Sequence, residues 1–458
     1  MAGSLRGMPG ALLTDLYELT MSASYLRRDM IAPATFSLYV RELPPERGFL
    51  VAAGLESCLA FLEALSFEDD DLAHLRSIGF DDRALADFAT VRFDGDVWAV
   101  PEGRVLYADE PMIEVTAPLP VAQIVETYLL NQVTLHTTLA TKAARYVLAA
   151  EGRDLVDFAF RRTHGVDAGL AVARASALVG FAATSNVEAA RRYGLPAAGT
   201  MAHAYIEAFP SEQAAFRAFA EDHPTRTTFL VDTYDSLNGV LNAIGTASSL
   251  GLTERLAIRL DSGDLEPLSR EARRLLDEAG LANARIYASG GLDEHEVAAL
   301  VQAGAPVDAF GIGTQLGVSA DAPYVDSVYK LTEYDGRPVV KLSVAKATAP
   351  GRKQVWRTLE NGAHRDVVGL RDESAPAGGV PMLEAVMKGG ERIDSDPSID
   401  EMRRRFGHDV VGVPHSARRL SNPEHISVAR SDALQTLTRQ AREDARGRAG
   451  LPPSSGSP

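Results

Sequence analysis

The sequence predicts an α/β fold with a parallel barrel or sheet at its centre and mixed α and β structure at both ends. The main observation is a repeated unit between Asp154 and Gly317, in which a short apolar run precedes a polar or glycine-rich cluster and an amphipathic helix. A second is that β-hairpin signals replace this rhythm after Val328. A third is the composition: 46% hydrophobic and 24% charged over 458 residues is typical of a chain with a large core and excludes wholesale disorder and coiled coil.

Residues 1–120 are expected to form a mixed α+β domain. Thr14 is a predicted N-cap for the first helix, with Asp15 and Glu18 as acidic residues in its first turn. Runs typical of strands and short helices follow: strands at Ala34–Val40, Val97–Val100 and Val105–Val115, and helices at Leu55–Leu65 and Asp82–Phe88. A long helical pattern from Val121 to Glu151 then leads into the central domain.

Residues 121–327 are expected to form the barrel domain. Its predicted strands are seven apolar runs: Leu155–Phe160, Leu178–Ala183, Ala197–Met201, Thr228–Val231, Leu256–Leu260, Arg285–Ala288 and Val307–Phe310. Polar clusters follow nearly all of them, so most reactive side chains fall at the carboxyl ends of strands, which form the catalytic face of βα barrels. A doubly wound sheet is the competing architecture, but it predicts one binding crevice rather than a ring of strand ends.

Residues 328–440 are expected to form β-hairpins and helices that pack with the N-terminal domain. Asp335-Gly336 and Asn361-Gly362 are type I′ turn signals, each between strand-like runs. The chain is helical and charged from Ser398, and residues 441–458 are expected to be a flexible tail because they end in GLPPSSGSP.

Charge and cysteine content exclude several functions. With 46 basic and 62 acidic residues, the net charge of -16 argues against binding to nucleic acid or an anionic membrane. The single cysteine, Cys58, cannot form an intrachain disulfide or a thiolate metal cluster. No signal-type apolar run precedes Asp15, and no stretch of 18 residues is predominantly apolar, so we expect a cytoplasmic protein.

An acidic cluster follows the run Leu256–Leu260. Asp261 can accept hydrogen bonds from ribose hydroxyls or bind Mg²⁺, and Arg259 offers a planar set of donors. Asp232 lies in the same position one strand earlier. Two neighbouring acidic strand ends favour a metal and ribose site, although an Asp-Ser-Gly turn also occurs as a simple helix cap.

Two glycine turns are candidate phosphate sites. Backbone N–H groups of Gly290 and Gly291, and of Gly311, Gly313 and Thr314, can hold a phosphate at the start of the following helix. Their spacing does not match the dinucleotide fingerprint GxGxxG, and tight barrel turns need glycine in any case.

His203 directly follows the run Ala197–Met201 and so is expected on the catalytic face. The ten histidines include no HExxH pattern, which excludes a zinc protease of that kind. A structural role remains the alternative for His203. Arg161 and Lys330 are among the basic residues that can supply the positive charge the chain lacks overall.

Taken in order, these clusters resemble the nicotinate phosphoribosyltransferase family from about Leu13 to Arg357. The segments that carry the resemblance are TDLYELTM, DFAFRRTHG, GFAATSNVEA, GTMAHAY, DTYD, IRLDSGDL, ASGGLDE, FGIGTQLG and PGRKQVWR. The resemblance implies an irregular parallel α/β barrel with a second, mixed α+β domain built from both chain ends.

The resemblance also implies an ATP-dependent, ligase-type enzyme of NAD salvage. It would condense nicotinate with phosphoribosyl pyrophosphate to nicotinate mononucleotide and pyrophosphate, using Mg²⁺ and coupling ATP hydrolysis through a phosphohistidine. A homodimer with shared active sites is expected.

The roles that the resemblance implies are as follows. His203 would be phosphorylated, Asp261 would bind ribose, and Arg259 would lie near the pyridine carboxylate and the ribose. Asp232 and Asp261 would serve the metal, and Phe158 would sandwich the pyridine ring with Tyr17 of a neighbouring subunit. The other expected substrate-binding residues are Arg161, Thr184, Ser185, Ser262, Gly263, Gly290, Gly291, Gly311, Gly313, Thr314 and Lys330.

Some positions bear on substrate choice. A glycine is commoner in the family at Ala159 and in the pair Ala182-Ala183, where methyl groups would lie close to the ring. Related nicotinamide enzymes place a carboxylate where Ser185 stands, and a carboxylate there would repel nicotinate, so Ser185 favours the acid. Nicotinamide or quinolinate phosphoribosyl transfer, or a catalytically silent barrel that acts as a binding protein, are the alternatives.

Overall fold

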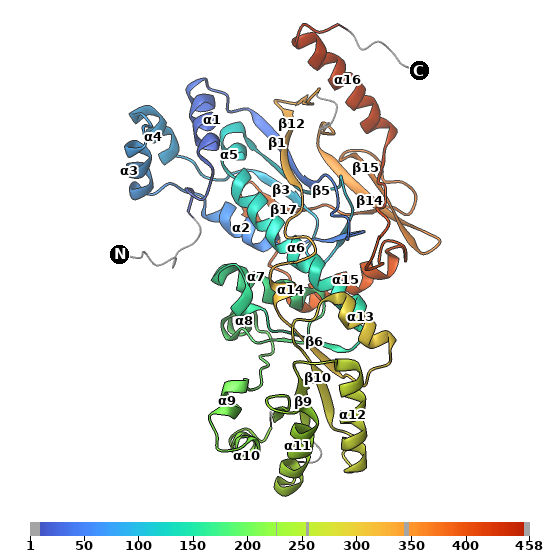
Figure 1. Ribbon diagram of the computed structural model, residues 1–458. Helices are drawn as coiled ribbons and strands as arrows, with labels where there is room; N and C mark the ends of the chain where they lie inside the picture. Colours follow the sequence, from blue (N-terminus) through green and yellow to red (C-terminus); the bar gives the residue numbers. More distant parts are fainter. Residues whose placement is uncertain (1–9, 226, 253–255, 343–347, 453–458) are drawn as a thin grey trace. The chain divides into compact units, whose positions relative to one another are not determined.

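The computed structural model describes residues 10–225, 227–252, 256–342 and 348–452. The chain divides into two compact units (Figure 1). Unit 1 comprises Met1–Thr137 and Tyr324–Pro458, and unit 2 comprises Thr138–Pro323. A second domain built from both ends of the chain is therefore present, and the helix α6 (Glu126–Ala150) belongs in part to each unit.

Unit 1 is built on a seven-stranded antiparallel sheet of order β13-β12-β1-β5-β3-β17-β18. Strand β1 lies between β5 and β12, and all but its first residue are buried. Alternate residues from Ala34 to Val40 form an apolar face, whereas Thr35 and Ser37 on the other face hydrogen bond side chains of β5. Phe36 of β1 stacks on Tyr329 of β12 with ring centroids 4.7 Å apart. The strands are β1 Pro33–Val40, β3 Asp96–Ala99, β5 Pro111–Pro118, β12 Ser327–Tyr334, β13 Arg337–Pro338, β17 Glu384–Lys388 and β18 Glu391–Arg392.

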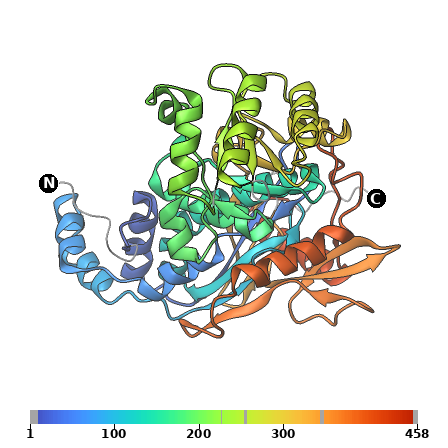
Figure 2. The same ribbon diagram turned by 90° about the horizontal axis from the view of Figure 1, so that it is seen from below.

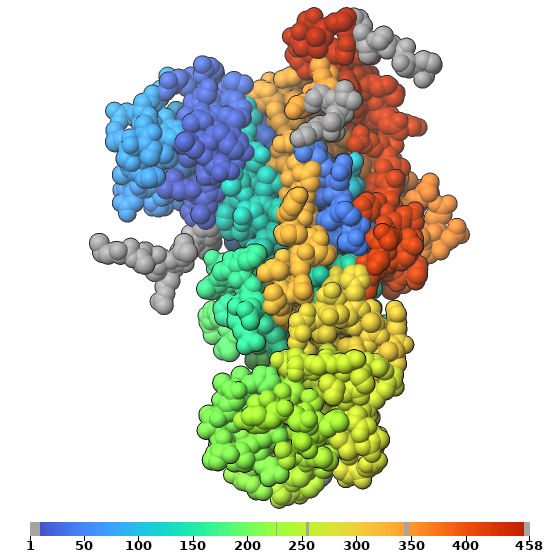
Figure 3. Space-filling model, in the orientation of Figure 1, coloured from blue at the N-terminus to red at the C-terminus, as the bar shows by residue number. Residues whose placement is uncertain are grey.

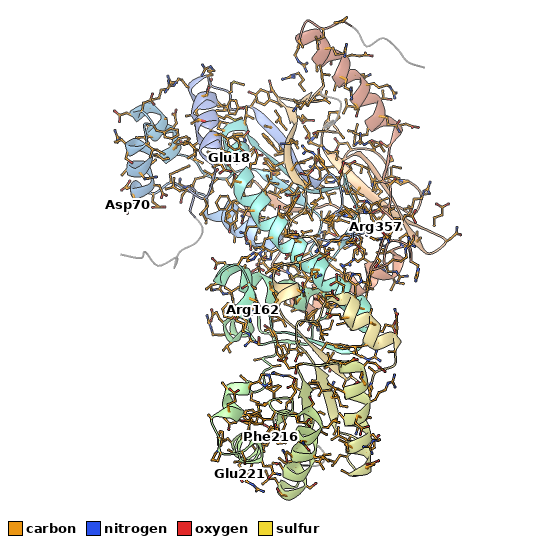
Figure 4. The ribbon with its side chains drawn as sticks, viewed as in Figure 1. Glu18, Asp70, Arg162, Phe216, Glu221 and Arg357 are labelled. Carbon is orange, nitrogen blue, oxygen red and sulfur yellow. The ribbon has the colours of Figure 1, made fainter. Side chains whose placement is uncertain are left out.

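Two smaller sheets and seven further helices complete unit 1. The sheets have the orders β16-β14-β15-β19 and β2-β4. Their strands are β2 Leu50–Val51, β4 Val105–Leu106, β14 Lys353–Glu360, β15 Ala363–Leu370, β16 Val380–Pro381 and β19 Ala429–Arg430. The helices in the described part of this unit are α1 Leu16–Arg27, α2 Leu55–Ala64, α3 Asp69–Ser77, α4 Asp82–Ala89, α5 Leu119–Ile124, α15 Ile399–Gly412 and α16 Asp432–Arg448. Glu18 on α1 and Arg357 on β14 are labelled in Figure 4.

Three expectations for this unit need correction. The helix α1 has Asp15 at its N-cap, and the hydroxyl of Thr14 instead donates to the carbonyl of Ile124 at 2.9 Å. The run Val105–Val115 forms two strands, because the chain turns at Asp109 with φ 65°. The pattern from Val121 to Glu151 forms α5 and α6, which are separated at Val125.

Both predicted hairpin turns are confirmed. Asp335 and Gly336 have φ 51° and 68°, and Asn361 and Gly362 have φ 53° and 81°, so both turns have the positive φ values of type I′. After the first turn only β13 is a strand, and residues 343–347 lie outside the described residues. Near the chain end α16 continues to Arg448, so residues 441–448 are helical rather than part of a tail; residues 449–452 carry no helix or strand.

Unit 2 contains a six-stranded, all-parallel sheet of order β7-β6-β11-β10-β9-β8. Its strands are β6 Asp154–Asp157, β7 Ala183–Thr184, β8 Thr228–Leu230, β9 Ala257–Leu260, β10 Arg285–Ala288 and β11 Ala309–Ile312. Within the described residues, the end strands β7 and β8 are not paired with each other, so backbone hydrogen bonds do not close the sheet into a complete barrel. Figure 2 shows this unit, coloured green to yellow, from a second direction.

Helices follow the strands of unit 2 in turn. They are α7 Val166–Val179, α8 Val187–Tyr193, α9 His203–Glu207, α10 Glu212–Asp222, α11 Ser236–Leu250, α12 Leu265–Glu278, α13 Glu294–Gln302 and α14 Thr314–Gly317, with a 3₁₀ turn at Phe160–Arg162. Phe216, labelled in Figure 4, stacks on Phe229 at 4.6 Å and anchors α10 on β8. Figure 3 shows the outer surface that α11 and α12 give this unit.

Two of the seven predicted strands differ from expectation. Leu178 and Val179 end the helix α7, and the strand begins only at Ala183. In the run Ala197–Met201, a single bridge joins Ala197 to Thr184. Neither run is long enough to separate a buried strand from the end of a buried helix by its pattern alone. No helix in the described part of the chain is both long and apolar enough to cross a membrane.

Candidate functional site

Two carboxylates meet at the carboxyl ends of β8 and β9. The Oδ2 atom of Asp232 accepts hydrogen bonds from the backbone N–H of Asp261 at 2.9 Å and from the hydroxyl of Ser262 at 2.6 Å. Its other oxygen, Oδ1, is buried and has no hydrogen-bond partner among the described residues. A buried carboxylate oxygen without a donor is costly, so this atom is suited to a cation or a donor on a ligand.

Asp261 is held by the next strand end as well. Its Oδ1 atom accepts a hydrogen bond from the hydroxyl of Ser289 at 2.5 Å. Gly290 then approaches the backbone of Asp261 so closely that a Cβ atom on Gly290 would lie 1.9 Å from the Asp261 carbonyl oxygen. Gly290 also has φ +107°, so this turn requires glycine on two grounds.

His203 lies beside this pair at the start of α9. Its Nε2 atom is 3.8 Å from Oδ2 of Asp261, and its Nδ1 atom is 3.2 Å from the hydroxyl of Thr233. The side chain is 41% exposed, so it is accessible to a second reactant. The contact with Thr233 therefore orients the imidazole, and its exposure allows a second reactant to reach it.

Arg259 brings positive charge to the same strand ends. It donates to the hydroxyl of Thr200, and its Nε atom is buried without a hydrogen-bond partner in the described part of the chain. Burial lowers the pKa of the guanidinium, while the carboxylates of Asp261 and Asp232 oppose that shift. An arginine nevertheless stays charged at neutral pH, so Arg259 is a cation with an unused donor.

A cavity of about 340 Å³ in unit 2 is lined mainly at the amino ends of β8, β9 and β10, and neither carboxylate lines it, nor does His203 or Arg259. Its lining includes Val156, Phe158, Thr200, Arg285 and Tyr287. Of the site residues expected from the sequence, only Phe158 lines this cavity, so its volume does not measure the substrate site.

Phe158 owes its place in this cavity to a glycine. The backbone N–H of Phe158 donates to the carbonyl of Ile312 at 2.8 Å. A Cβ atom on Gly311 would lie 2.6 Å from Cε2 of the Phe158 ring, so only glycine leaves room for the ring here. Two expected site residues from distant parts of the sequence are thus in direct contact.

Asp157 organises the other side of the site and was not predicted. Its side chain accepts hydrogen bonds from the hydroxyl of Thr184 at 2.7 Å and from the N–H of Ala159 at 2.8 Å, and its carbonyl accepts from the N–H of Ser185 at 2.8 Å. Burial raises its pKa, and these hydrogen bonds oppose the rise. Asp157 therefore fixes Thr184 and Ser185 next to the strand that carries Phe158.

Other supporting residues also went unpredicted. Thr200, Thr233 and Ser289 each hydrogen bond an expected site residue. Thr233 and Ser289 belong to the motifs DTYD and ASGG, so their position next to a candidate residue was the available signal. Nothing in the sequence indicated that Thr200 meets Arg259, because that contact depends on the chain path.

The remaining predicted residues of unit 2 lie at strand ends. Arg161 is exposed on the 3₁₀ turn, and its positive charge lowers the pKa of Arg259. Gly263, Gly291 and Thr314 are exposed, Gly313 is half-buried at the N-cap of α14, and Ser262 is exposed. Gly291 has φ +87° with open space around it.

Tyr17 and Lys330 belong to unit 1. Tyr17 is 47% exposed on α1, and burial together with the carboxylates of Glu126 and Glu18 raises the pKa of its phenol. Lys330 is half-buried on β12. Their expected contact with substrate stays a prediction.

The pair Asp232 and Asp261 fits Mg²⁺. No group of three or more histidine, cysteine or acidic residues that could enclose a metal occurs in the described ranges. Mg²⁺ is usually bound by one or two carboxylates together with substrate phosphates and water, and a full protein cage is not needed. The unpartnered Oδ1 of Asp232 is the oxygen best placed to serve it.

Comparisons with known proteins cover most of the chain. Models of the nicotinate phosphoribosyltransferase family match residues 12–134 (N-terminal domain), 154–362 (the family model) and 379–438 (C-terminal domain). The chain is 48% identical to nicotinate phosphoribosyltransferase pncB2 of Mycobacterium tuberculosis, over 94% of each chain. It is 42% identical to nicotinate phosphoribosyltransferase of Bacillus subtilis, over 79% of this chain and 76% of the relative.

Solved structures agree with these relatives. The crystal structure of human nicotinic acid phosphoribosyltransferase matches with a TM-score of 0.83 at 28% identity, over 93% of this chain and 99% of that chain. Nicotinate-nucleotide pyrophosphorylase of Pyrococcus furiosus matches with a TM-score of 0.72 at 25% identity, over 87% and 95%.

Proposed function

The chain belongs to the nicotinate phosphoribosyltransferase family, and from that premise we propose that it condenses nicotinate with phosphoribosyl pyrophosphate to form nicotinate mononucleotide and pyrophosphate. The observation that carries this proposal is the cluster of Asp232, Asp261, Arg259 and His203 at adjacent strand ends. Carboxylates, a guanidinium and an imidazole in this arrangement would suit a phosphorylated sugar.

The reaction needs positioning more than covalent chemistry. The pyridine nitrogen forms a bond to the anomeric carbon of ribose while the bond to pyrophosphate breaks, so positive charge develops on the ribose ring in the transition state. Asp261 would accept hydrogen bonds from the ribose hydroxyls and stabilise that charge. Mg²⁺, held by Asp232 and Asp261, would supply charge neutralisation for the leaving pyrophosphate.

The two glycine turns would hold the 5′-phosphate. Gly290 and Gly291 have positive φ. Because they have no side chain, a phosphate could approach their backbone N–H groups closely. Gly313 and Thr314 begin the short helix α14 and would add donors from the neighbouring strand. Ser262 and Gly263 would complete the ribose side.

The base would bind next to Phe158. The ring of Phe158 lines the cavity, and Ser185 is fixed through the backbone of Asp157. A serine is neutral and can donate to the nicotinate carboxylate, to which Arg259 and Arg161 are attracted. We propose that Tyr17 from the second subunit of a homodimer covers the other face of the pyridine ring.

ATP would act through His203. With Nδ1–H donating to Thr233, the lone pair on Nε2 attacks the terminal phosphorus of ATP, the bond to ADP breaks, and phosphohistidine and ADP result. The added negative charge beside Asp261 would change the site before phosphoribosyl pyrophosphate reacts, and hydrolysis of the phosphohistidine would return it to its first state. This coupling would place the enzyme in the ATP-dependent salvage of nicotinate toward NAD in the cytoplasm.

The test is a direct assay of the mononucleotide. The protein is incubated with nicotinate, phosphoribosyl pyrophosphate and Mg²⁺, with and without ATP, and a parallel reaction replaces nicotinate with nicotinamide. We expect product from nicotinate, more of it with ATP, and little from nicotinamide. Product from nicotinamide alone would favour the amide enzyme, and binding without product from either base would indicate a silent barrel.

A further inference from the structure

A buried ion cluster lies outside the catalytic residues of unit 2. Nζ of Lys142 is 2.6 Å from Oε2 of Glu294 and 3.0 Å from Oδ1 of Asp321, and Nε of Arg145 is 2.7 Å from Oε1 of Glu294. The side chains of Lys142, Arg145 and Glu294 are at most 4% exposed. Two cations and two carboxylates thus balance where an unpaired charge would be very unfavourable.

This cluster joins one face of α6 to the glycine turn after β10. Glu294 is the first residue of α13, only three positions after Gly291. Tyr146, which lies one helical turn after Lys142, donates from its hydroxyl to the carbonyl of Leu292 at 3.0 Å. The chain between Gly291 and Glu294 is therefore held by both a backbone contact and an ion pair.

The same helix face holds the segment after the second glycine turn. Asp321 follows α14, the short helix that begins after Gly313. Lys142 contacts both Asp321 and Glu294, so it links the regions that follow the two candidate phosphate turns.

The start of α13 carries several negative charges, and Lys142 and Arg145 act on one of them. The first turn of α13 carries Glu294 and Glu296, with Asp293 as its N-cap. A helix start normally favours a phosphate, whereas uncompensated carboxylates there repel one. Lys142 and Arg145 lower the pKa of Glu294 against the opposing effect of burial, so its charge exists but is neutralised.

We infer that Lys142 and Arg145 are positioning residues for the 5′-phosphate: they neutralise Glu294 and fix the turn of Gly290 and Gly291 so that it accepts an anion. The inference rests on the proposed function, because it concerns the phosphate end of that same site. Lys142 and Arg145 themselves do not touch substrate.

The test compares Lys142→Met with Glu294→Gln, because neutralisation predicts that they act in opposite directions. Ribose 5-phosphate serves as the probe, and its Kd is measured by calorimetry alongside the KM of each substrate. Lys142→Met leaves Arg145 as one cation against the two carboxylates of Glu294 and Asp321, and this excess negative charge should raise the Kd and the KM for phosphoribosyl pyrophosphate by about tenfold, with the KM for nicotinate within about twofold. Glu294→Gln leaves an excess cation and should leave the Kd unchanged or lower it.

Two more variants keep the test decisive if Lys142→Met does not fold. Lys142→Arg should bind ribose 5-phosphate like the wild type, and Lys142→Met combined with Glu294→Gln should recover most of the lost affinity. Equal loss of affinity in Lys142→Met and Glu294→Gln would show a purely structural role and overturn the inference, as would no change in either.

A matched control is Arg104→Met. It breaks another ion pair, between Arg104 and the buried Asp409 at 2.7 Å in unit 1, and should lower the Tm while leaving the Kd for ribose 5-phosphate unchanged. A wild type that forms no mononucleotide would overturn the proposed function. An active wild type whose KM for phosphoribosyl pyrophosphate is the same in Lys142→Met would overturn only the positioning role.

Discussion

The Nε2 atom of His203 lies 3.8 Å from Oδ2 of Asp261, the carboxylate expected to bind ribose. The opposite ring atom, Nδ1, lies 3.2 Å from the hydroxyl of Thr233. A phosphoryl group on this ring would add negative charge directly beside Asp261. The distance is thus short enough for a change at the histidine to alter the binding of the sugar phosphate.

His203→Ala should abolish both phosphorylation by ATP and the stimulation of product formation by ATP. Incubation with γ-labelled ATP should give the wild type an acid-labile, base-stable label, which is the behaviour of a phosphohistidine. The variant should keep some ATP-independent product formation, because Asp232, Asp261 and Arg259 remain in place.

The control for this experiment is His74→Ala, since His74 lies on α3 in unit 1 and is exposed. It should label like the wild type. A label that persists in His203→Ala would assign the phosphoryl acceptor to another residue.

Ser185→Asp should weaken the use of nicotinate. The N–H of Ser185 donates to the carbonyl of Asp157, which fixes the backbone at this position, and in the proposed complex a carboxylate here would face that of nicotinate. Like charges in a confined site cost about 1–2 kcal/mol, so the KM for nicotinate should rise roughly tenfold. Ser185→Asn, which adds similar bulk without charge, is the control. Unchanged turnover of nicotinate in Ser185→Asp would show that the residue does not line the base site.

The strand ends that carry the candidate residues could be predicted because their signals are local. An apolar run followed by Asp261 marks the end of β9, and one followed by Ser289-Gly290 marks the end of β10; parallel strands place such ends at one edge of a sheet. The hairpin at Asn361-Gly362 was predictable for the same reason, since positive φ at both residues selects this pair.

The residues that support the site depend on the chain path and could not be predicted. Asp157 hydrogen bonds Thr184, which is 27 positions away, and Arg259 reaches Thr200 across 59 positions. The run Leu178–Ala183 failed as a strand because a short apolar stretch suits a buried helix end equally well. Closure of the sheet likewise depends on backbone pairing between its end strands, which no local pattern reports.

Gly311→Ala should raise the KM for nicotinate. The added methyl group would lie 2.6 Å from the ring of Phe158, so the ring must move into or away from the cavity. We expect a loss of about 1–3 kcal/mol in stability from overpacking and a several-fold increase in KM. Gly245→Ala on α11 is the control, because a methyl group there meets nothing within 4 Å and should leave activity unchanged. Wild-type kinetics in Gly311→Ala would remove Phe158 from the base site.

Glu18→Gln should change how stability depends on pH. Burial is the main cause that raises the pKa of Glu18 from 4.5 to about 7, although hydrogen bonds from Thr127 and Thr14 oppose it. Between these two pH values the folded state binds more protons than the unfolded state, so the free energy of unfolding falls as pH rises and the contribution is lost above pH 7.

The measurement is urea unfolding at pH 5 and pH 7.5 for both proteins. The wild type should lose roughly 2–3 kcal/mol more than Glu18→Gln over this interval. Other carboxyl groups with raised pKa, such as Asp157, contribute to both proteins and cancel in the difference. Parallel curves for the two proteins would mean that Glu18 titrates normally.

Mixing Tyr17→Ala chains with Asp261→Ala chains should restore activity that neither has alone. Tyr17 on α1 is 47% exposed, and its sequence neighbours Leu13 and Leu16 are also exposed, so this end of α1 offers apolar surface that a second molecule can cover. If the base site takes Tyr17 from the partner, a mixed dimer combines an intact Asp261 with an intact Tyr17 in one site and collects both defects in the other. Random mixing makes half of the dimers mixed, so about a quarter of wild-type activity should return.

The control replaces the Asp261→Ala chain with one that carries both substitutions, because that mixture cannot assemble an intact site. Recovery in the control mixture, no recovery in the test mixture, or a fully active monomer by light scattering would show that the site is complete within one chain.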